Sequence, residues 1–173
     1  MLINPIDVYL GLGGNVGYTL AIFDKVIQDL EGLDGIYTLE CASTYKTSPI
    51  SPIHQDFFLN TVLHIRTLYS PRLLHQFLQQ IETRHGKIPK GKNEPRVIDI
   101  DVLLYGTRIQ TSPSLIIPHP QWTKRLFVLY PLHELTPSIS IYQKKSKSYK
   151  NYSIRTLIKQ LKKTNPEQIC IKQ

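Results

Sequence analysis

Two aspartates, Asp99 and Asp101, stand two residues apart in RVIDIDVLLYG, a segment whose other residues are mostly typical of a buried β-strand. Because side chains alternate between the faces of a strand, both carboxylates should project from one face and the aliphatic residues from the other. Two ionised carboxylates about 5 Å apart repel by roughly 3 kcal/mol at an effective dielectric near 20. Mg²⁺ relieves such repulsion and commonly takes one or two carboxylates plus substrate phosphates. The pair therefore suggests a magnesium site, against the alternative of a solvated sheet face beside surface lysines.

Cations suited to phosphate oxygens surround this pair. Arg96 stands three residues before Asp99, and the preceding loop, KIPKGKNEP, carries Lys87, Lys90 and Lys92. Carboxylates for a metal together with cations for phosphates are typical of phosphoryl transfer, in which positioning and charge neutralisation provide most of the catalysis. The pattern favours an enzyme that acts on a nucleotide or another polyphosphate.

The common phosphate-binding motifs are missing from the chain. GLGGNVG, at residues 11–17, has Val16 where a dinucleotide fingerprint has its third glycine, and the chain has no G-K-[ST] sequence. GLGGNVG is therefore interpreted as a turn from a strand to a helix. Among the histidines, His119 in LIIPHP lies on a loop restricted by prolines and is the best candidate for a nucleotide or phosphate contact. The other histidines lack ligand spacing.

A second pair of side chains suits a planar ligand. In the expected strand FFLNTVLHIRT, Phe58 and Asn60 share one face, while a nearly apolar face packs inward. An aromatic ring and an amide are thereby presented side by side.

The elements that would position these residues follow a β-α-β-β-α-β order. This order predicts an α+β fold of the ferredoxin-like type, with an antiparallel sheet and helices packed on one face. Thr19 and Ser70 are the expected N-caps of the two helices. Beyond this core we expect a hairpin at 107–118, an exposed loop at 143–152, and extra C-terminal helices at 121–135 and 153–163, the last with Ser153 as its N-cap.

Chain length and the distribution of charge limit the kinds of protein that this sequence could encode. With 173 residues, the chain predicts a single domain over 1–173. The net charge of +8 comes from a basic C-terminal segment that begins at about residue 138, since residues 138–173 hold nine Lys or Arg and one acid. Such a segment is more often a solvated surface than a polyanion-binding arm. The N-terminus does not resemble a signal peptide and no apolar run approaches about 20 residues, so a cytoplasmic protein without a membrane partner is expected.

Four motifs occur together in the order and spacing of a known family. They are GLGGNVG, YKTSPISP followed by DFFLN, EPRVIDIDVLLYG, and LIIPHPQWTKRLFVLYPL. On these motifs the chain resembles the 6-hydroxymethyl-7,8-dihydropterin pyrophosphokinases of the folate pathway, over residues 6 to about 135. The resemblance implies transfer of pyrophosphate from ATP to a reduced pterin with release of AMP, and two Mg²⁺ ions as cofactor.

The resemblance also implies roles for individual residues. The metal ligands would be Asp99 and Asp101, and with them the catalytic set includes Lys87 and Arg96. The nucleotide-binding set comprises Gln79, Glu82, Arg96, His119 and Arg125, to which the loop charge adds Lys90 and Lys92. The pterin-binding set comprises Thr47, Pro49, Ile50, Phe58, Asn60 and Phe127.

The chain departs from the common family pattern in the loop at 87–95. This loop is one residue shorter and has no tryptophan, and Lys87 replaces an arginine. A bidentate phosphate contact would therefore become a point charge. Phe58 stands where tyrosine is frequent, Pro120 where an aromatic is frequent, and Gly14 where serine is usual.

Two alternatives to the pyrophosphokinase hypothesis remain at this stage. A ferredoxin-like module could bind nucleic acid through the basic C-terminal segment, although the strands lack the interleaved aromatics of an RNA-recognition sheet. A degenerate enzyme could bind ATP without turnover, because of the altered loop. Since this activity is often fused to neighbouring folate enzymes, the chain could also belong to a multifunctional protein.

Overall fold

The computed structural model describes residues 4–49, 55–88, 95–143 and 145–173. The first half contains β1 (Ile6–Gly14), α1 (Thr19–Glu31), β2 (Ile36–Cys41), β3 (Tyr45–Thr47), β4 (Phe58–Thr67) and α2 (Pro71–Arg84). The second half contains β5 (Asp99–Tyr105), β6 (Gln110–Ser112), β7 (Leu115–Ile117), the 3₁₀ turn η1 (Trp122–Lys124), α3 (Leu126–Leu135), β8 (Ser138–Gln143), β9 (Ser148–Ser153), α4 (Ile154–Thr164) and β10 (Cys170–Lys172).

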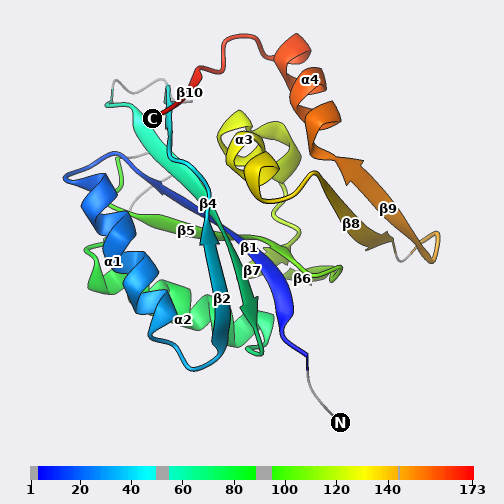
Figure 1. Ribbon diagram of the computed structural model, residues 1–173, viewed down its shortest axis with the longest axis horizontal. Helices are drawn as coiled ribbons and strands as arrows, with labels where there is room; N and C mark the ends of the chain where they lie inside the picture. Colours follow the sequence, from blue (N-terminus) through cyan, green and yellow to red (C-terminus); the bar gives the residue numbers. More distant parts are fainter. Residues whose placement is uncertain (1–3, 50–54, 89–94, 144) are drawn as a thin grey trace.

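Six of the described strands form one antiparallel sheet with β1 near its centre (Figure 1). The path runs β10-β3-β4-β1-β5, and β2 pairs with the far half of β4, next to β3 along the same edge. Residues 36–46, which the sequence marks only as rich in β-formers, are thus divided between two strands that share one partner. The β6-β7 hairpin confirms the connection expected at 107–118.

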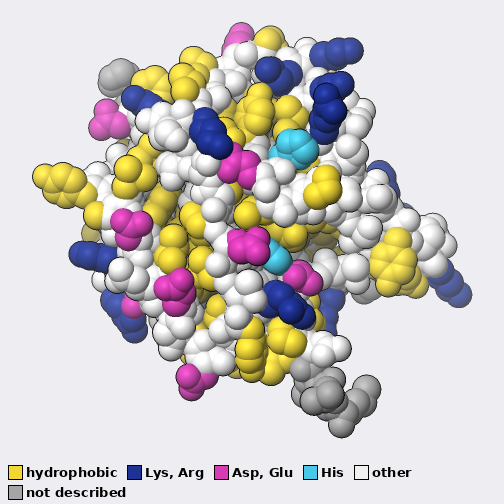
Figure 2. Space-filling view, in the orientation of Figure 1, with side chains coloured by type: hydrophobic (Ala, Val, Ile, Leu, Met, Phe, Trp, Pro, Cys, Tyr) yellow, Lys and Arg dark blue, Asp and Glu magenta, His cyan; other side chains and the backbone are white. Residues whose placement is uncertain are grey.

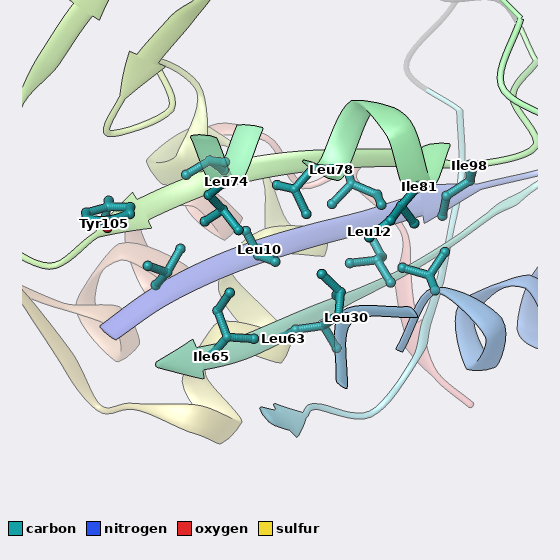
Figure 3. Close-up of a cluster of buried hydrophobic side chains, with 14 of the residues drawn as sticks. Leu10, Leu12, Leu30, Leu63, Ile65, Leu74, Leu78, Ile81, Ile98 and Tyr105 are labelled. Carbon is teal, nitrogen blue, oxygen red and sulfur yellow. The ribbon is translucent and has the colours of Figure 1, made fainter. Parts of the chain in front are cut away.

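The two faces of the sheet carry different helices. On one face α1 and α2 cover an apolar cluster that includes Leu10 and Leu12 of β1, Leu63 of β4 and Leu74 and Leu78 of α2 (Figure 3). On the other face, Val62 and Leu103 pack in a second cluster with α3 and α4. The expectation of helices on one face therefore holds for α1 and α2 only. Part of this second face is apolar, and the candidate site described below occupies another part of it.

The helix boundaries follow the local capping residues. Ser70 Oγ accepts a hydrogen bond from Leu73 N at 3.3 Å, and Ser153 Oγ accepts one from Thr156 N at 3.4 Å, which confirms both predicted N-caps. At α1 the predicted cap is wrong by one residue. Thr19 is already helical and buried, and the cap position belongs to Tyr18.

The basic C-terminal segment differs from its prediction in one part. Residues 143–152 are not only a loop, because β8 and β9 form a two-stranded hairpin through this region. Most side chains of β9 are exposed, so no apolar alternation marks it as a strand. Lys and Arg side chains gather over α4 at the upper right of Figure 2, as expected of a solvated face. Within the described residues, no helix is both long and apolar enough to cross a membrane.

Candidate active site

A cavity of about 500 Å³ lies on the α3 side of the sheet, at the end where β1 meets the start of β4 and β5. Strand pairing determines which residues form the floor of this cavity. Gly13 of β1 is paired with Asn60 of β4 on one side and with Asp99 of β5 on the other. A Cβ atom on Gly13 would lie 2.9 Å from Asn60 Oδ1, so only glycine leaves room for this amide over β1. The glycine-rich strand therefore brings an amide and a carboxylate to one face.

The two aspartates line this cavity and have different surroundings. Asp99 forms ion pairs with Lys87, at 2.6 Å between Nζ and Oδ1, and with Arg96. Among the described residues, the ion-pair contacts of Asp101 are looser, at 3.9 Å from its Oδ2 to His119 Nε2 and to an Arg125 amino nitrogen. Its side chain is 43% exposed. Asp101 can thus turn its carboxylate towards a ligand at the cost of these two loose contacts.

This donor set fits magnesium. Both carboxylates are hard oxygen donors on one strand face, and both open to the cavity. In the described part of the chain, no group of three or more His, Cys, Asp or Glu side chains is placed to hold a metal ion. Mg²⁺ needs no such cluster, because water and substrate phosphates normally complete its octahedron. Asp99 and Asp101 could therefore hold the ion together with a bound polyphosphate.

A buried glutamate supports the aspartates from α2. Glu82 Oε1 accepts hydrogen bonds from Lys87 Nζ and from the backbone N–H of Ile100, both at 2.6 Å. Burial raises the pKa of Glu82, and these two hydrogen bonds oppose that shift only in part. Burial alone would lower the pKa of Lys87, but the carboxylates of Asp99 and Glu82 outweigh it and raise the pKa. Lys87 therefore remains an ammonium between two acids.

Replacing Glu82 with alanine should lower the free energy of unfolding by about 2–3 kcal/mol, because the Ile100 N–H and the Lys87 ammonium would lose their acceptor. Glutamine keeps an oxygen for Ile100, so Glu82→Gln should cost less. Urea denaturation of both variants measures this difference. Gln80→Ala, on the exposed face of the same helix, is the control, and equal losses for the two Glu82 variants would contradict the proposed role.

His119 approaches Asp101 from the loop after β7. Its Nδ1 accepts a hydrogen bond from Gln121 N at 3.1 Å, which directs the other ring nitrogen, Nε2, towards Asp101. Burial lowers the pKa of His119 more than the neighbouring Asp101 raises it. The histidine is therefore suited to donating a hydrogen bond as a neutral ring.

Aromatic and amide groups also line the cavity, on its β4 side. Asn60 is buried, and its Nδ2 donates a hydrogen bond to Thr47 Oγ1 at 2.8 Å. Phe58 of β4 and Phe127 of α3 both line the same cavity. Rings from two elements and a fixed amide suit a flat, polar-edged heterocycle.

Comparison with known proteins identifies the family. The model of the 7,8-dihydro-6-hydroxymethylpterin-pyrophosphokinase family matches residues 9–137. The chain belongs to this family. A 2-amino-4-hydroxy-6-hydroxymethyldihydropteridine pyrophosphokinase of Methylorubrum extorquens is 36% identical over 133 residues, which are 77% of this chain and 84% of the relative.

Other relatives are longer proteins. The folic acid synthesis protein fol1 of Pneumocystis carinii is 36% identical over 136 residues, and the match spans 77% of this chain but only 18% of fol1. Among solved structures, a Plasmodium falciparum HPPK-DHPS superimposes with a TM-score of 0.69 at 13% identity, over 94% of this chain and 46% of that one. This likeness supports the fold. The comparisons give no support to the nucleic-acid-binding alternative.

The structure brings together most of the residues that the family resemblance selects. Those that line the cavity are Thr47, Phe58, Asn60, Arg96, Asp99, Asp101, Arg125 and Phe127. Lys87 contacts Asp99 and His119 approaches Asp101, while Glu82 joins the same group through Lys87.

A few of the selected residues lie elsewhere. Gln79 is exposed on α2 and lines a separate surface hollow, because it lies on the helix face turned away from β5. Pro49 follows the cavity-lining Ser48 but does not line the cavity itself. Ile50, Lys90 and Lys92 lie outside the described residues.

Some contributions to the site escaped the sequence interpretation. GLGGNVG is more than a turn, since Asn15 Oδ1 accepts a hydrogen bond from Arg96 N at 2.8 Å and Arg96 O accepts one from Asn15 N at 2.9 Å. Gly11 and Gly13 lie on one face of the strand, and this pattern could have indicated a surface left open for a ligand. Cavity-lining residues of the C-terminal segment, Asn165 and Gln168, carried no signal in the sequence.

Proposed function

We propose that this protein transfers the pyrophosphoryl group of ATP to the hydroxymethyl oxygen of 6-hydroxymethyl-7,8-dihydropterin in folate biosynthesis. One observation carries the proposal. A single cavity has Phe58 and the Asn60 amide on its β4 side, two metal-suited carboxylates on its β5 side, and a second ring and basic groups around them. Family membership agrees with this division.

At the pterin end, recognition would rest on rigid groups. The hydrogen bond to Thr47 fixes the Asn60 amide, so its orientation is set before a ligand arrives. Phe58 and Phe127 would stack against the two faces of the pterin ring. Pro49 and Ile50 are included in the proposed pterin loop on the strength of the family resemblance alone.

At the phosphate end, the pterin hydroxyl oxygen would attack the β-phosphorus of ATP in line with the leaving AMP. One O–P bond forms, the bond from the β-phosphorus to the bridging oxygen of AMP breaks, and the hydroxyl proton passes to water. When bound at Asp99 and Asp101, two Mg²⁺ ions would supply positive charge at the transferring phosphates. Arg96 and Arg125 would hold the phosphate oxygens, and His119 would donate a hydrogen bond beside Asp101.

The loop that contains Lys87 would exclude water when both substrates are bound. Lys87 would leave Asp99 for a phosphate oxygen, because a polyphosphate offers more negative charge than one carboxylate. Lys90 and Lys92 would add charge from the same loop. Gln79, exposed on α2, is included among the nucleotide contacts on the strength of the family resemblance alone.

The sheet also supports a finer description of the fold. Within the six-stranded sheet, the order β2-β4-β1-β5 agrees with two interleaved β-α-β units, the ferredoxin-like arrangement. We include this arrangement in the proposal, with β3, β10 and the two hairpins as additions.

The proposed activity predicts AMP as the nucleotide product. Incubation with ATP, magnesium and the reduced pterin should give AMP and pterin diphosphate in equal amounts, measured by ion-exchange chromatography. Omission of either the pterin or magnesium should abolish AMP formation. ADP as the product, or AMP formation that persists in Asp101→Ala, would contradict the proposal.

A further inference from the structure

The C-terminal segment from Asn165 to Lys172 closes one side of the cavity. It runs from the end of α4 back to the sheet, where β10 pairs with β3 (the red segment of Figure 1). Asn165 and Gln168 both line the cavity. The family match ends at residue 137, so this wall lies outside the matched region.

Gln168 holds the backbone on both sides of Arg125. Its Oε1 accepts a hydrogen bond from Leu126 N at 3.0 Å, and its Nε2 donates one to Lys124 O at 3.3 Å. Leu126 is the first residue of α3, whose opening N–H groups have no partner within the helix. One side-chain amide therefore fixes the two peptide groups that set the direction of Arg125.

Arg125 connects this point to both ends of the site. Its amino nitrogen lies 3.9 Å from Asp101 Oδ2. Its guanidinium carbon lies 5.5 Å from the centre of the Phe127 ring, in a cation–π arrangement. A rotation of the backbone at Arg125 would move the guanidinium away from Asp101 and disturb the ring proposed to cover the pterin.

The segment that carries Gln168 is itself anchored on both sides of the cavity. Ile169 O accepts a hydrogen bond from Ser48 N at 3.4 Å, and Cys170 pairs with Thr47. Farther along, Lys172 Nζ lies 2.9 Å from Glu134 Oε1 on α3. These contacts fix the Gln168 backbone next to the proposed pterin edge, so its side chain spans from β3 to α3.

We propose that Gln168 is a positioning residue that holds Arg125 towards the polyphosphate and Phe127 towards the pterin. The reaction that Gln168 would serve rests on the proposed function. Its action on Arg125, however, predicts an effect on nucleotide binding that can be measured without the reaction. The C-terminal segment would then form part of the active site, in addition to its basic surface.

The test is a double-mutant cycle between Gln168 and Arg125. Gln168→Ala should weaken binding of a non-hydrolysable ATP analogue with Mg²⁺ about 3- to 10-fold, the range for one neutral hydrogen bond, because Gln168 acts on the nucleotide only through Arg125. The same change in an Arg125→Ala background should have little further effect, since its action passes through Arg125. Calorimetry measures nucleotide binding without turnover. An inactive wild-type protein would therefore refute the proposed function, while the binding cycle would still test the role of Gln168.

A conservative variant separates positioning from stability. In Gln168→Glu the carboxylate still accepts from Leu126 N at a helix N-terminus, so the melting temperature should match the wild type. It cannot donate to Lys124 O, and its charge would attract the Arg125 guanidinium, so nucleotide affinity should stay low. Recovery of affinity together with melting temperature, or an equal effect of Gln168→Ala with and without Arg125, would overturn the proposal. Gln160→Ala, exposed on α4, is the matched control and should bind as wild type.

Discussion

Asp101→Asn should reduce kcat by about 100- to 1000-fold, equivalent to about 3–4 kcal/mol of lost transition-state stabilisation. The amide keeps the shape of the side chain but removes the negative charge that would hold Mg²⁺ at the transferring phosphates. Asp101 is the better choice than Asp99, because Asp99 also forms ion pairs with Lys87 and Arg96. Steady-state AMP formation at saturating pterin measures the loss.

Two further measurements separate metal binding from folding in this variant. The magnesium concentration for half-maximal rate should rise, since one of the two proposed carboxylate ligands is lost. The melting temperature should not fall, because in the described part of the chain the variant weakens the loose 3.9 Å contacts of Asp101 and relieves repulsion with Asp99. Asp24→Asn, exposed on α1 at the opposite face of the sheet, is the control. Wild-type kcat with an unchanged magnesium requirement would refute the assignment of Asp101.

Asn60→Ala should weaken pterin binding by roughly 30- to 100-fold, equivalent to about 2–3 kcal/mol. The side chain is buried and fixed by its hydrogen bond to Thr47, so its remaining oxygen is presented to a ligand at no cost in ordering. Removing it also leaves the Thr47 hydroxyl without this donor. Quenching of pterin fluorescence in the presence of an ATP analogue measures the affinity.

The effect should be specific to the pterin. Affinity for the ATP analogue alone should change less than about 2-fold, because Asn60 is held by Thr47 and is not one of the charged groups proposed to hold the phosphates. Asn151→Ala, exposed on β9, is the control for an asparagine in a strand. Equal losses for both ligands would show that Asn60 supports the cavity as a whole and does not recognise the pterin.

The strands that carry the chemistry could be predicted from their own alternation. Asp99 and Asp101 share a face of β5, and Phe58 and Asn60 share a face of β4, because side-chain direction in a strand depends only on position along it. The caps at Ser70 and Ser153 are equally local. By contrast, the division of residues 36–46 into β2 and β3 depends on a shared partner strand that is distant in the sequence.

What the sequence by itself determined was therefore the set of chemical groups and the strand faces that carry them. The tertiary structure decided how those groups meet. Pairing across β1 places Gly13 between Asn60 and Asp99, and helix α2 places Glu82 beneath Lys87. The return of the chain after α4 places Gln168 against the backbone around Arg125. Such contacts join residues far apart in the chain, and no local periodicity encodes them, because they exist only once the two faces of the sheet are packed.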